Sequence, residues 1–317
     1  MSHYLITGCA GFIGSSLTDA LLARGMKVTG VDAFRDYYDT SLKRRNVSSA
    51  QNSDLFTLAE EDLSGDTAFL DRFIDPGEQL VIYHLAAQAG VRKSWGSDFT
   101  VYTRDNIEAT QNLLEWALKR GGVVNFVYAS SSSVYGIPEK LPMVEDRTVP
   151  IPHSPYGVTK LAAENLVRLY TANMGLPSVS LRFFTVYGPR QRPDMAFNRF
   201  ITAGLRGEPI GVFGTGEQTR DFTYIADIVQ GLILAENSTG GLAMNLGGGN
   251  RVTLLQAIET LSNIMDDPLE ISFTKGKRGD VPDTWASTDL ARSELGWMPE
   301  TPLEEGLIRE FHWIKNR

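Results

Sequence analysis

Short apolar runs alternate with amphipathic stretches over the first half of the chain. The apolar runs are rich in β-prone residues and predict buried strands at residues 4–7, 27–31, 55–59, 80–85, 123–129 and 179–184. Helical spacing of apolar residues predicts helices at residues 12–24, 65–73, 98–119 and 155–172. Strands that alternate with helices in this way indicate βαβ units and a parallel sheet.

The pattern changes after about Gly188. Elements become shorter, and Gly and Pro interrupt them more often, as at residues 188–193 and 247–249. We therefore expect an α/β protein with a doubly wound parallel sheet of the Rossmann type in residues 1–180. A smaller mixed α/β region for substrate should occupy mainly residues 181–317, with some segments returning to the first domain.

The composition limits which kinds of molecule the protein is expected to bind. The 317 residues are 42% hydrophobic and 21% charged, with a net charge of −8, which argues against nucleic acid as the default partner. A single cysteine, Cys9, fits a reducing compartment, and we assign it no chemistry. No apolar run approaches the ~20 residues of a membrane span. We expect a cytoplasmic protein without membrane contact or a metal site.

A glycine-rich turn lies between the first strand and the first helix. Gly8, Gly11 and Gly14 follow a GxxGxxG spacing that lets backbone N–H groups approach a diphosphate at the helix N-terminus. Asp32 ends the second strand, where a carboxylate binds a ribose 2′-hydroxyl and disfavours a 2′-phosphate. The motif therefore predicts NAD in preference to NADP. The alternative for Asp32 is a cap of the turn after the strand.

A phenol and an ammonium lie four residues apart at Tyr156 and Lys160, on one face of a predicted helix. A nearby positive charge stabilises phenolate, so the pair suits proton removal from an alcohol during hydride transfer. Such spacing also occurs by chance on solvated helix faces. Ser131, in a run of four serines at a strand end, is the candidate to bind the same hydroxyl, although spacing alone does not choose among the four.

These motifs together resemble the extended short-chain dehydrogenase/reductases, in the nucleotide-sugar epimerase and dehydratase branch. The matching residues are Gly8, Gly11, Gly14, Asp32, His84-Leu85-Ala86-Ala87-Gln88, Asn106, Val134-Tyr135-Gly136 after the serines, Tyr156, Lys160, residues 181–189, residues 214–222 and Asn245-Leu246-Gly247. The resemblance spans essentially the whole chain. It implies NAD contacts from Gly8, Gly11, Phe12, Ile13, Gly14, Asp32, Asp62, Leu63, Leu85, Ala86, Ala87 and Lys160. For Asp62, a helix cap is nearly as good an explanation.

The serine run separates the branches of this family. Dehydratases carry an Asp-Glu pair before Val-Tyr-Gly, and decarboxylases that make UDP-xylose carry Glu at the position of Ser133. Here these positions are Ser132 and Ser133, whose hydroxyls are neutral, and the resemblance implies that both contact the substrate. The resemblance therefore implies oxidation and re-reduction at one carbon, which is epimerisation.

The string from Phe183 to Met195 resembles UDP-glucuronate 4-epimerases. In those enzymes residues matching Thr185 and Arg192 hold the sugar carboxylate, and a guanidinium suits that role. The resemblance further implies substrate contacts from Arg220, Arg278, Asp283 and, with weaker support, Arg92. A phosphate contact or a surface position is the alternative for Arg192, a solvated loop for Arg278 and an ordered loop for Arg92.

The predicted activity is interconversion of UDP-glucuronate and UDP-galacturonate with Tyr156 as base and Lys160 on the nicotinamide ribose. The alternatives are another UDP-sugar 4-epimerase, such as one acting on UDP-glucose, a UDP-glucuronate decarboxylase and a non-catalytic NAD-binding regulator. The family also leads us to expect a homodimer, formed by helices near 98–119 and 154–172. The alternative is that the apolar residues of these helices belong to the core of the domain.

Overall fold

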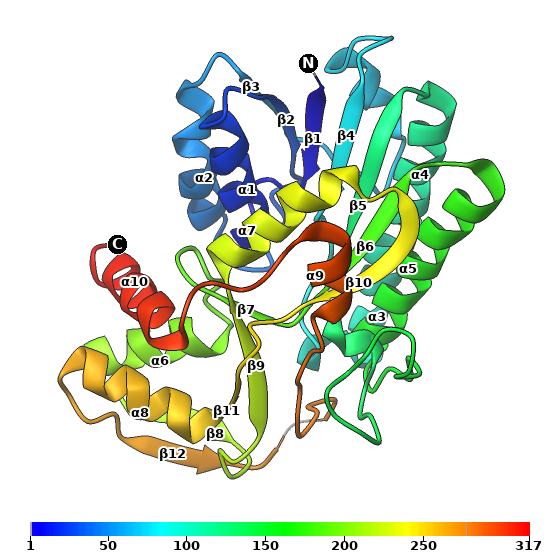
Figure 1. The fold of residues 1–317 in the computed structure, drawn as a ribbon. Coiled ribbons are helices and arrows are strands. Elements are labelled where there is room, and N and C mark those ends of the chain that lie inside the picture. Colours follow the sequence, from blue (N-terminus) through cyan, green and yellow to red (C-terminus); the bar gives the residue numbers. More distant parts are fainter. Residues whose placement is uncertain (1, 277) are drawn as a thin grey trace.

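A seven-stranded parallel sheet forms the centre of the larger lobe. The computed structural model describes residues 2–276 and 278–317, and its strand order is β10-β6-β5-β4-β1-β2-β3 (Figure 1). These strands are β1 (His3–Thr7), β2 (Lys27–Val31), β3 (Phe56–Ala59), β4 (Leu80–His84), β5 (Val123–Ser131), β6 (Ser178–Phe183) and β10 (Gly240–Leu246). The predicted doubly wound sheet is confirmed, and the bounds of β1 to β6 differ from the predicted ones by no more than two residues.

Helices cover both faces of this sheet because alternate strand residues point to opposite sides. Tyr4 and Ile6 pack in one core with α1 (Phe12–Leu22) and α7 (Ile225–Leu234). Leu5 packs in a second core with α4 (Ala109–Arg120) and α5 (Pro155–Met174). The strand order reverses where β1 lies between β2 and β4, and ligands of doubly wound sheets bind at such a point.

The predicted helix at 98–119 is interrupted. The structure has α3 (Phe99–Thr103), a π-helical turn (Arg104–Glu108) and then α4. Inside that turn, Asn106 accepts the N–H of Gln88 (2.7 Å) and donates to Gln88 O (3.1 Å) and Thr159 Oγ1 (2.9 Å). These bonds connect the π-helical turn to Gln88, after β4, and to Thr159 on α5, and π-helical turns frequently occur at functional sites.

Two further differences concern short elements. The helical pattern at 65–73 forms only a 3₁₀ helix (Thr67–Arg72), and α2 (Thr40–Ser48) was not predicted. Asp39 caps α2 by accepting the N–H of Ser41 (2.9 Å). Among the described residues, no helix is long and apolar enough to cross a membrane.

The smaller lobe is built from short sheets and helices, at the lower left of Figure 1. Its strands are β7 (Thr185–Tyr187), β9 (Thr219–Tyr224) and β11 (Arg251–Thr253) in one sheet, and β8 (Ile210–Phe213) and β12 (Ile271–Thr274) in another. Its helices are α6 (Ala196–Leu205), α8 (Leu254–Met265) and α10 (Leu303–Lys315), while α9 (Asp289–Leu295) lies near β10. Because α7 and β10 return to the larger lobe, the chain crosses between the lobes several times.

Candidate active site

The glycine turn after β1 forms a cradle for a diphosphate. Gly8 has a φ of +71°, which favours glycine, and a methyl group there would lie 2.9 Å from the backbone of Ala86. A methyl group at Gly14 would overlap the carbonyl oxygen of Gly8. No side chain caps the N-terminus of α1, whose N-cap is Gly11, so its N–H groups stay available for phosphate oxygens.

Asp32 directly follows β2 and lies on the wall of the cavity next to this cradle. Its Oδ2 accepts the N–H of Ala10 (3.1 Å), and its Oδ1 accepts the N–H of Phe34 (2.8 Å). The carboxylate therefore both caps the local turn and faces the cavity, so the two interpretations of Asp32 are compatible. The site fits a dinucleotide with an unmodified ribose.

The cofactor cavity measures about 270 Å³. All predicted cofactor contacts line it, namely Gly8, Gly11, Phe12, Ile13, Gly14, Asp32, Asp62, Leu63, Leu85, Ala86, Ala87 and Lys160. Asp62 also binds Arg35 (2.6 Å) and the N–H of Ser64 (3.0 Å), which matches the alternative of a local cap.

The serine run is divided between two roles. Ser130 donates to Glu164 (2.6 Å) inside the larger lobe, and Glu164 also binds Arg182 (2.5 Å). Ser131 instead lines the second cavity with Tyr156, the first residue after Pro155 at the start of α5, and its hydroxyl acts to lower the pKa of that phenol. The structure thus brings Ser131, and not Ser130, to the predicted base.

The electrostatics around Tyr156 differ in one respect from the sequence prediction. Burial raises the pKa of Tyr156, while the hydroxyl of Ser131 and the guanidinium of Arg192 act in the opposite direction. The predicted source of positive charge was Lys160, but its Nζ lies 4.3 Å from the ring centroid of Tyr128. Burial lowers the pKa of Lys160 to about 7, opposed by Glu164. Arg192 is therefore the cation that favours phenolate here.

A second cavity, of about 730 Å³, opens beside the first. Tyr156 and Arg192 line both cavities, so a group at the junction meets the predicted base and the predicted carboxylate partner together. The predicted substrate contacts Ser132, Ser133, Thr185 and Arg92 also line the second cavity. Arg92 is already bound to Asp280 through Nε (3.1 Å) and Nη2 (3.0 Å).

Three predicted substrate contacts do not line either cavity. Arg220 donates to the carbonyl oxygens of Val281 (2.8 Å) and Pro282 (2.9 Å), so it holds the loop that contains these two residues. Asp283 binds Thr219 and Arg251, and Arg278 lies over the ring of Trp95 (5.3 Å).

Sequence reasoning missed two residues at the junction. Tyr37 lines both cavities, and Asp194 lines the second and binds Arg192. Tyr37 lies in the sequence Asp36-Tyr37-Tyr38-Asp39, and Asp194 lies in the string from Phe183 to Met195, but neither residue had a role assigned to it.

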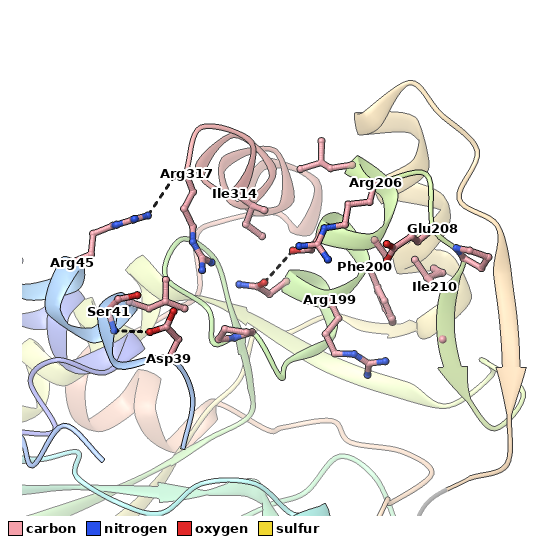
Figure 2. A pocket seen from close by; sticks show the side chains of 18 residues that line it. Asp39, Ser41, Arg45, Arg199, Phe200, Arg206, Glu208, Ile210, Ile314 and Arg317 are labelled. Carbon is pink, nitrogen blue, oxygen red and sulfur yellow. Dashed lines mark hydrogen bonds between the residues drawn. The ribbon is translucent and has the colours of Figure 1, made fainter. Parts of the chain in front are cut away.

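A third cavity, of about 710 Å³, lies among α2, α6 and α10. Figure 2 shows Arg45, Arg199, Arg206 and Arg317 on its walls. Pro193 also lines it, so the segment around Pro193 separates this cavity from the second one.

A doubly wound sheet, a glycine cradle at its switch point and a serine, tyrosine and lysine at the adjoining strand and helix define an extended short-chain dehydrogenase/reductase fold. Residues 4–247 match the NAD dependent epimerase/dehydratase family, and the chain belongs to this family.

Curated relatives and a solved structure extend the match over the full length. The chain is 42% identical to the uncharacterized UDP-glucose epimerase YtcB of Bacillus subtilis (98% of each chain). It is 41% identical to the UDP-glucuronate 4-epimerase of Thermodesulfobacterium geofontis, over 99% of this chain and 97% of that protein. A UDP-glucuronic acid 4-epimerase from Bacillus cereus, solved with UDP-glucuronic acid and NAD, matches with a TM-score of 0.93 and 42% identity over 99% of each chain.

Proposed function

We propose that the protein is an NAD-dependent UDP-glucuronate 4-epimerase, which interconverts UDP-glucuronate and UDP-galacturonate. The observation that carries the proposal is the junction of the two cavities, where Arg192 lies beside Tyr156 and Thr185 lines the same wall. A carboxylate partner beside the base suits a uronic acid better than a neutral sugar. The relatives named UDP-glucuronate 4-epimerase support the same substrate.

The glycine cradle and Asp32 are proposed to hold NAD, with Lys160 on the nicotinamide ribose. When bound there, NAD supplies a reversible acceptor for the hydrogen at C4 of the sugar. In this scheme residues 1–180 are mainly the cofactor domain and residues 181–317 mainly the UDP-sugar domain. Arg220, Arg278 and Asp283 remain proposed sugar-nucleotide contacts, although in this structure they pair with protein groups.

Tyr156 is the proposed base and acid. As phenolate it removes the C4-hydroxyl proton, while Ser131 binds the same oxygen. Once the 4-keto sugar has turned about its diphosphate linkage, Tyr156 returns the proton to the new hydroxyl. Ser132 and Ser133 supply no carboxylic acid of the kind that the family's dehydratases and decarboxylases carry at these positions, which favours epimerisation.

Thr185 and Arg192 are proposed to restrain the sugar carboxylate. The 4-keto intermediate is a β-keto acid, and it loses carbon dioxide when its C5–carboxyl bond lies parallel to the π orbital of the C4 ketone. A carboxylate held by a guanidinium and a hydroxyl is kept away from that alignment. Arg92 lines the same cavity and is paired with Asp280. It is proposed to release Asp280 and to bind the sugar nucleotide instead.

Assembly and location are also part of the proposal. Val158 and Leu169 are 48% and 52% exposed and lie about three turns apart on one face of α5, which suits a homodimer built on that helix. Light scattering on the purified protein tests this, since a monomer at assay concentration would contradict it. A single buried cysteine suits the reducing cytoplasm.

The proposed activity is tested by incubating the protein with UDP-glucuronate, without added reductant, and separating the products. UDP-galacturonate as the main product supports the proposal. UDP-xylose or a 4-keto pentose as the only product indicates a decarboxylase, and turnover of UDP-glucose alone indicates a neutral-sugar epimerase. No turnover, together with ligand binding that Tyr156→Phe leaves unchanged, indicates a regulator.

A further inference from the structure

Arg192 is held by an acid two residues along the chain. Its Nε donates to Asp194 Oδ1 (2.9 Å) and its Nη2 to Asp194 Oδ2 (3.0 Å). Both residues line the sugar cavity, whereas Pro193 between them lines the cavity of Figure 2 on the other side. Asp194 therefore stands on the sugar side of the wall, beside the arginine that is proposed to bind the substrate.

The main chain that carries this pair is fixed before it. Gly188 N donates to Glu310 (2.8 Å), and Arg190 donates to Asp19 (2.6 Å). Gln191 accepts two bonds from Asn198, one at its main-chain oxygen (2.7 Å) and one at its side-chain oxygen (3.0 Å). These partners come from α10, α1 and α6, so three helices hold the segment. What remains free to move at Arg192 is mainly its own side chain, and the bond to Asp194 removes that freedom.

The bond uses one edge of the guanidinium. A guanidinium has two edges that can each bind a carboxylate with two parallel bonds. Asp194 occupies the Nε/Nη2 edge, and within residues 2–276 and 278–317 no acceptor binds Nη1. Although burial acts against it, the bond from Arg192 lowers the pKa of Asp194, so the carboxylate stays charged and the pair stays formed near neutral pH.

We propose that Asp194 is a positioning residue that fixes Arg192 so that its Nη1/Nη2 edge faces the carboxylate of the sugar. This inference rests on the proposed function, and it concerns the fate of the 4-keto intermediate. Asp194 itself does not touch the reacting atoms. It acts on them only through the orientation of Arg192.

The consequence is a choice between two products. If the sugar ring turns its C5–carboxyl bond parallel to the π orbital of the C4 ketone, that bond breaks, carbon dioxide leaves, and the electron pair of the bond forms an enolate with the ketone. Solvent then protonates C5 and gives a UDP-4-keto pentose, while the two electrons taken from C4 stay on the cofactor. An Arg192 that is held in place keeps the carboxylate restrained and favours return to UDP-galacturonate.

The test measures the fraction of consumed UDP-glucuronate that is released as UDP-4-keto pentose and carbon dioxide. We expect Asp194→Asn to raise this fraction about tenfold, because a small loss of alignment at a reacting bond has effects of at least this order. A merely structural role would lower overall turnover and leave the product ratio unchanged. Thermal unfolding of the variant, with and without NAD, checks that the fold is retained.

Asp280→Asn is the matched control. Asp280 binds Arg92 through the same Nε/Nη2 edge and lines the same cavity, so this change removes an equal charge from the cavity without releasing Arg192. Because this change also frees Arg92, it alters the KM for UDP-glucuronate, but we expect its product ratio to equal that of the unmodified protein. A rise as large as that of Asp194→Asn would overturn the inference, since it would assign the effect to charge alone.

Two other results separate the inference from the function beneath it. If Asp194→Asn binds UDP-glucuronate more tightly and keeps the original product ratio, Asp194 competes with the substrate for Arg192 and the inference is wrong. If the unmodified protein does not convert UDP-glucuronate at all, the proposed function fails first and the inference falls with it.

Discussion

At the scale of single residues, the chemistry depends on which neighbours face Tyr156. The sequence identified Tyr156 and Lys160, because one helical turn separates them, but it left the choice of serine open. That choice depends on Ser130 turning toward Glu164, a contact made across 34 residues that no local spacing reveals. The role of Arg192 near the phenol has the same origin, since Arg192, in the loop between β7 and α6, and Tyr156, on α5, line the same cavities only in the folded chain.

The pH dependence of oxidation should depend on Arg192. Burial raises the pKa of Tyr156 and Arg192 opposes this effect, so removing the guanidinium raises that pKa further. Because the reaction needs phenolate, the rate rises with pH, and Arg192→Met should shift this rise to higher pH in single-turnover experiments with saturating UDP-glucuronate. Arg147→Met is the control, since Arg147 pairs with Asp146 on the surface and is not among the groups that shift Tyr156. Identical profiles for Arg192→Met and the unmodified protein would contradict this assignment.

At the scale of elements, the strands were predictable and the π-helical turn was not. Strands of a parallel sheet are buried on both faces, so they appear in the sequence as continuous apolar runs. The turn at Arg104–Glu108 has ordinary helical spacing in the sequence. Its geometry follows from bonds between Asn106 and the distant Gln88 and Thr159, which hold the cofactor-side loop against the helix that carries Tyr156.

Asn106→Asp should weaken NAD binding. The new carboxylate still accepts the Gln88 N–H but no longer donates to Gln88 O and Thr159. Two of the three bonds that Asn106 makes with these residues are therefore lost. Each lost bond to a buried group costs about 1–3 kcal/mol, and we expect NAD affinity to fall about tenfold. Calorimetric titration with NAD measures this, and Asn173→Asp, near the exposed C-terminal end of α5 where Asn173 donates to Leu169 O (3.2 Å), serves as the control. Unchanged NAD affinity would show that the bonds of Asn106 do not position the loop that carries Gln88 beside the cofactor cavity.

Glu310 joins α10 to the segment that carries Arg192. It is fully buried, its Oε2 accepts the Gly188 N–H (2.8 Å), and its Oε1 has no partner within the described residues. Burial raises its pKa well above 4.5, so its contribution to stability is greatest at low pH and is lost as pH rises through the folded-state pKa.

Glu310→Gln should remove this pH-dependent loss, so that the variant gains stability relative to the unmodified protein as pH rises. Glu310→Ala loses the bond to Gly188 and leaves a void, which should cost about 2–4 kcal/mol. Urea unfolding at several pH values measures both changes. A stability difference between Glu310→Gln and the unmodified protein that does not vary with pH would refute the account of Glu310.

At the scale of the whole molecule, the two lobes meet at one reaction centre. The fold class followed from the alternation of strands and helices and from the glycine turn. The assembly of the smaller lobe was not predictable in detail, because its strands are as short as the three residues of β7 and β11 and their pairing is non-local. That pairing places Thr185 and Arg192 beside a base from the larger lobe, and on this arrangement the proposed epimerase activity depends.

The most direct test follows the hydrogen at C4. UDP-glucuronate labelled with deuterium at C4 is converted in ordinary water, and the UDP-galacturonate formed is analysed by mass spectrometry and NMR. Oxidation and return at one carbon, with NAD retained in the site, predicts that the deuterium stays at C4 of the product. Loss of the label to solvent, or solvent hydrogen at C4, would contradict the account.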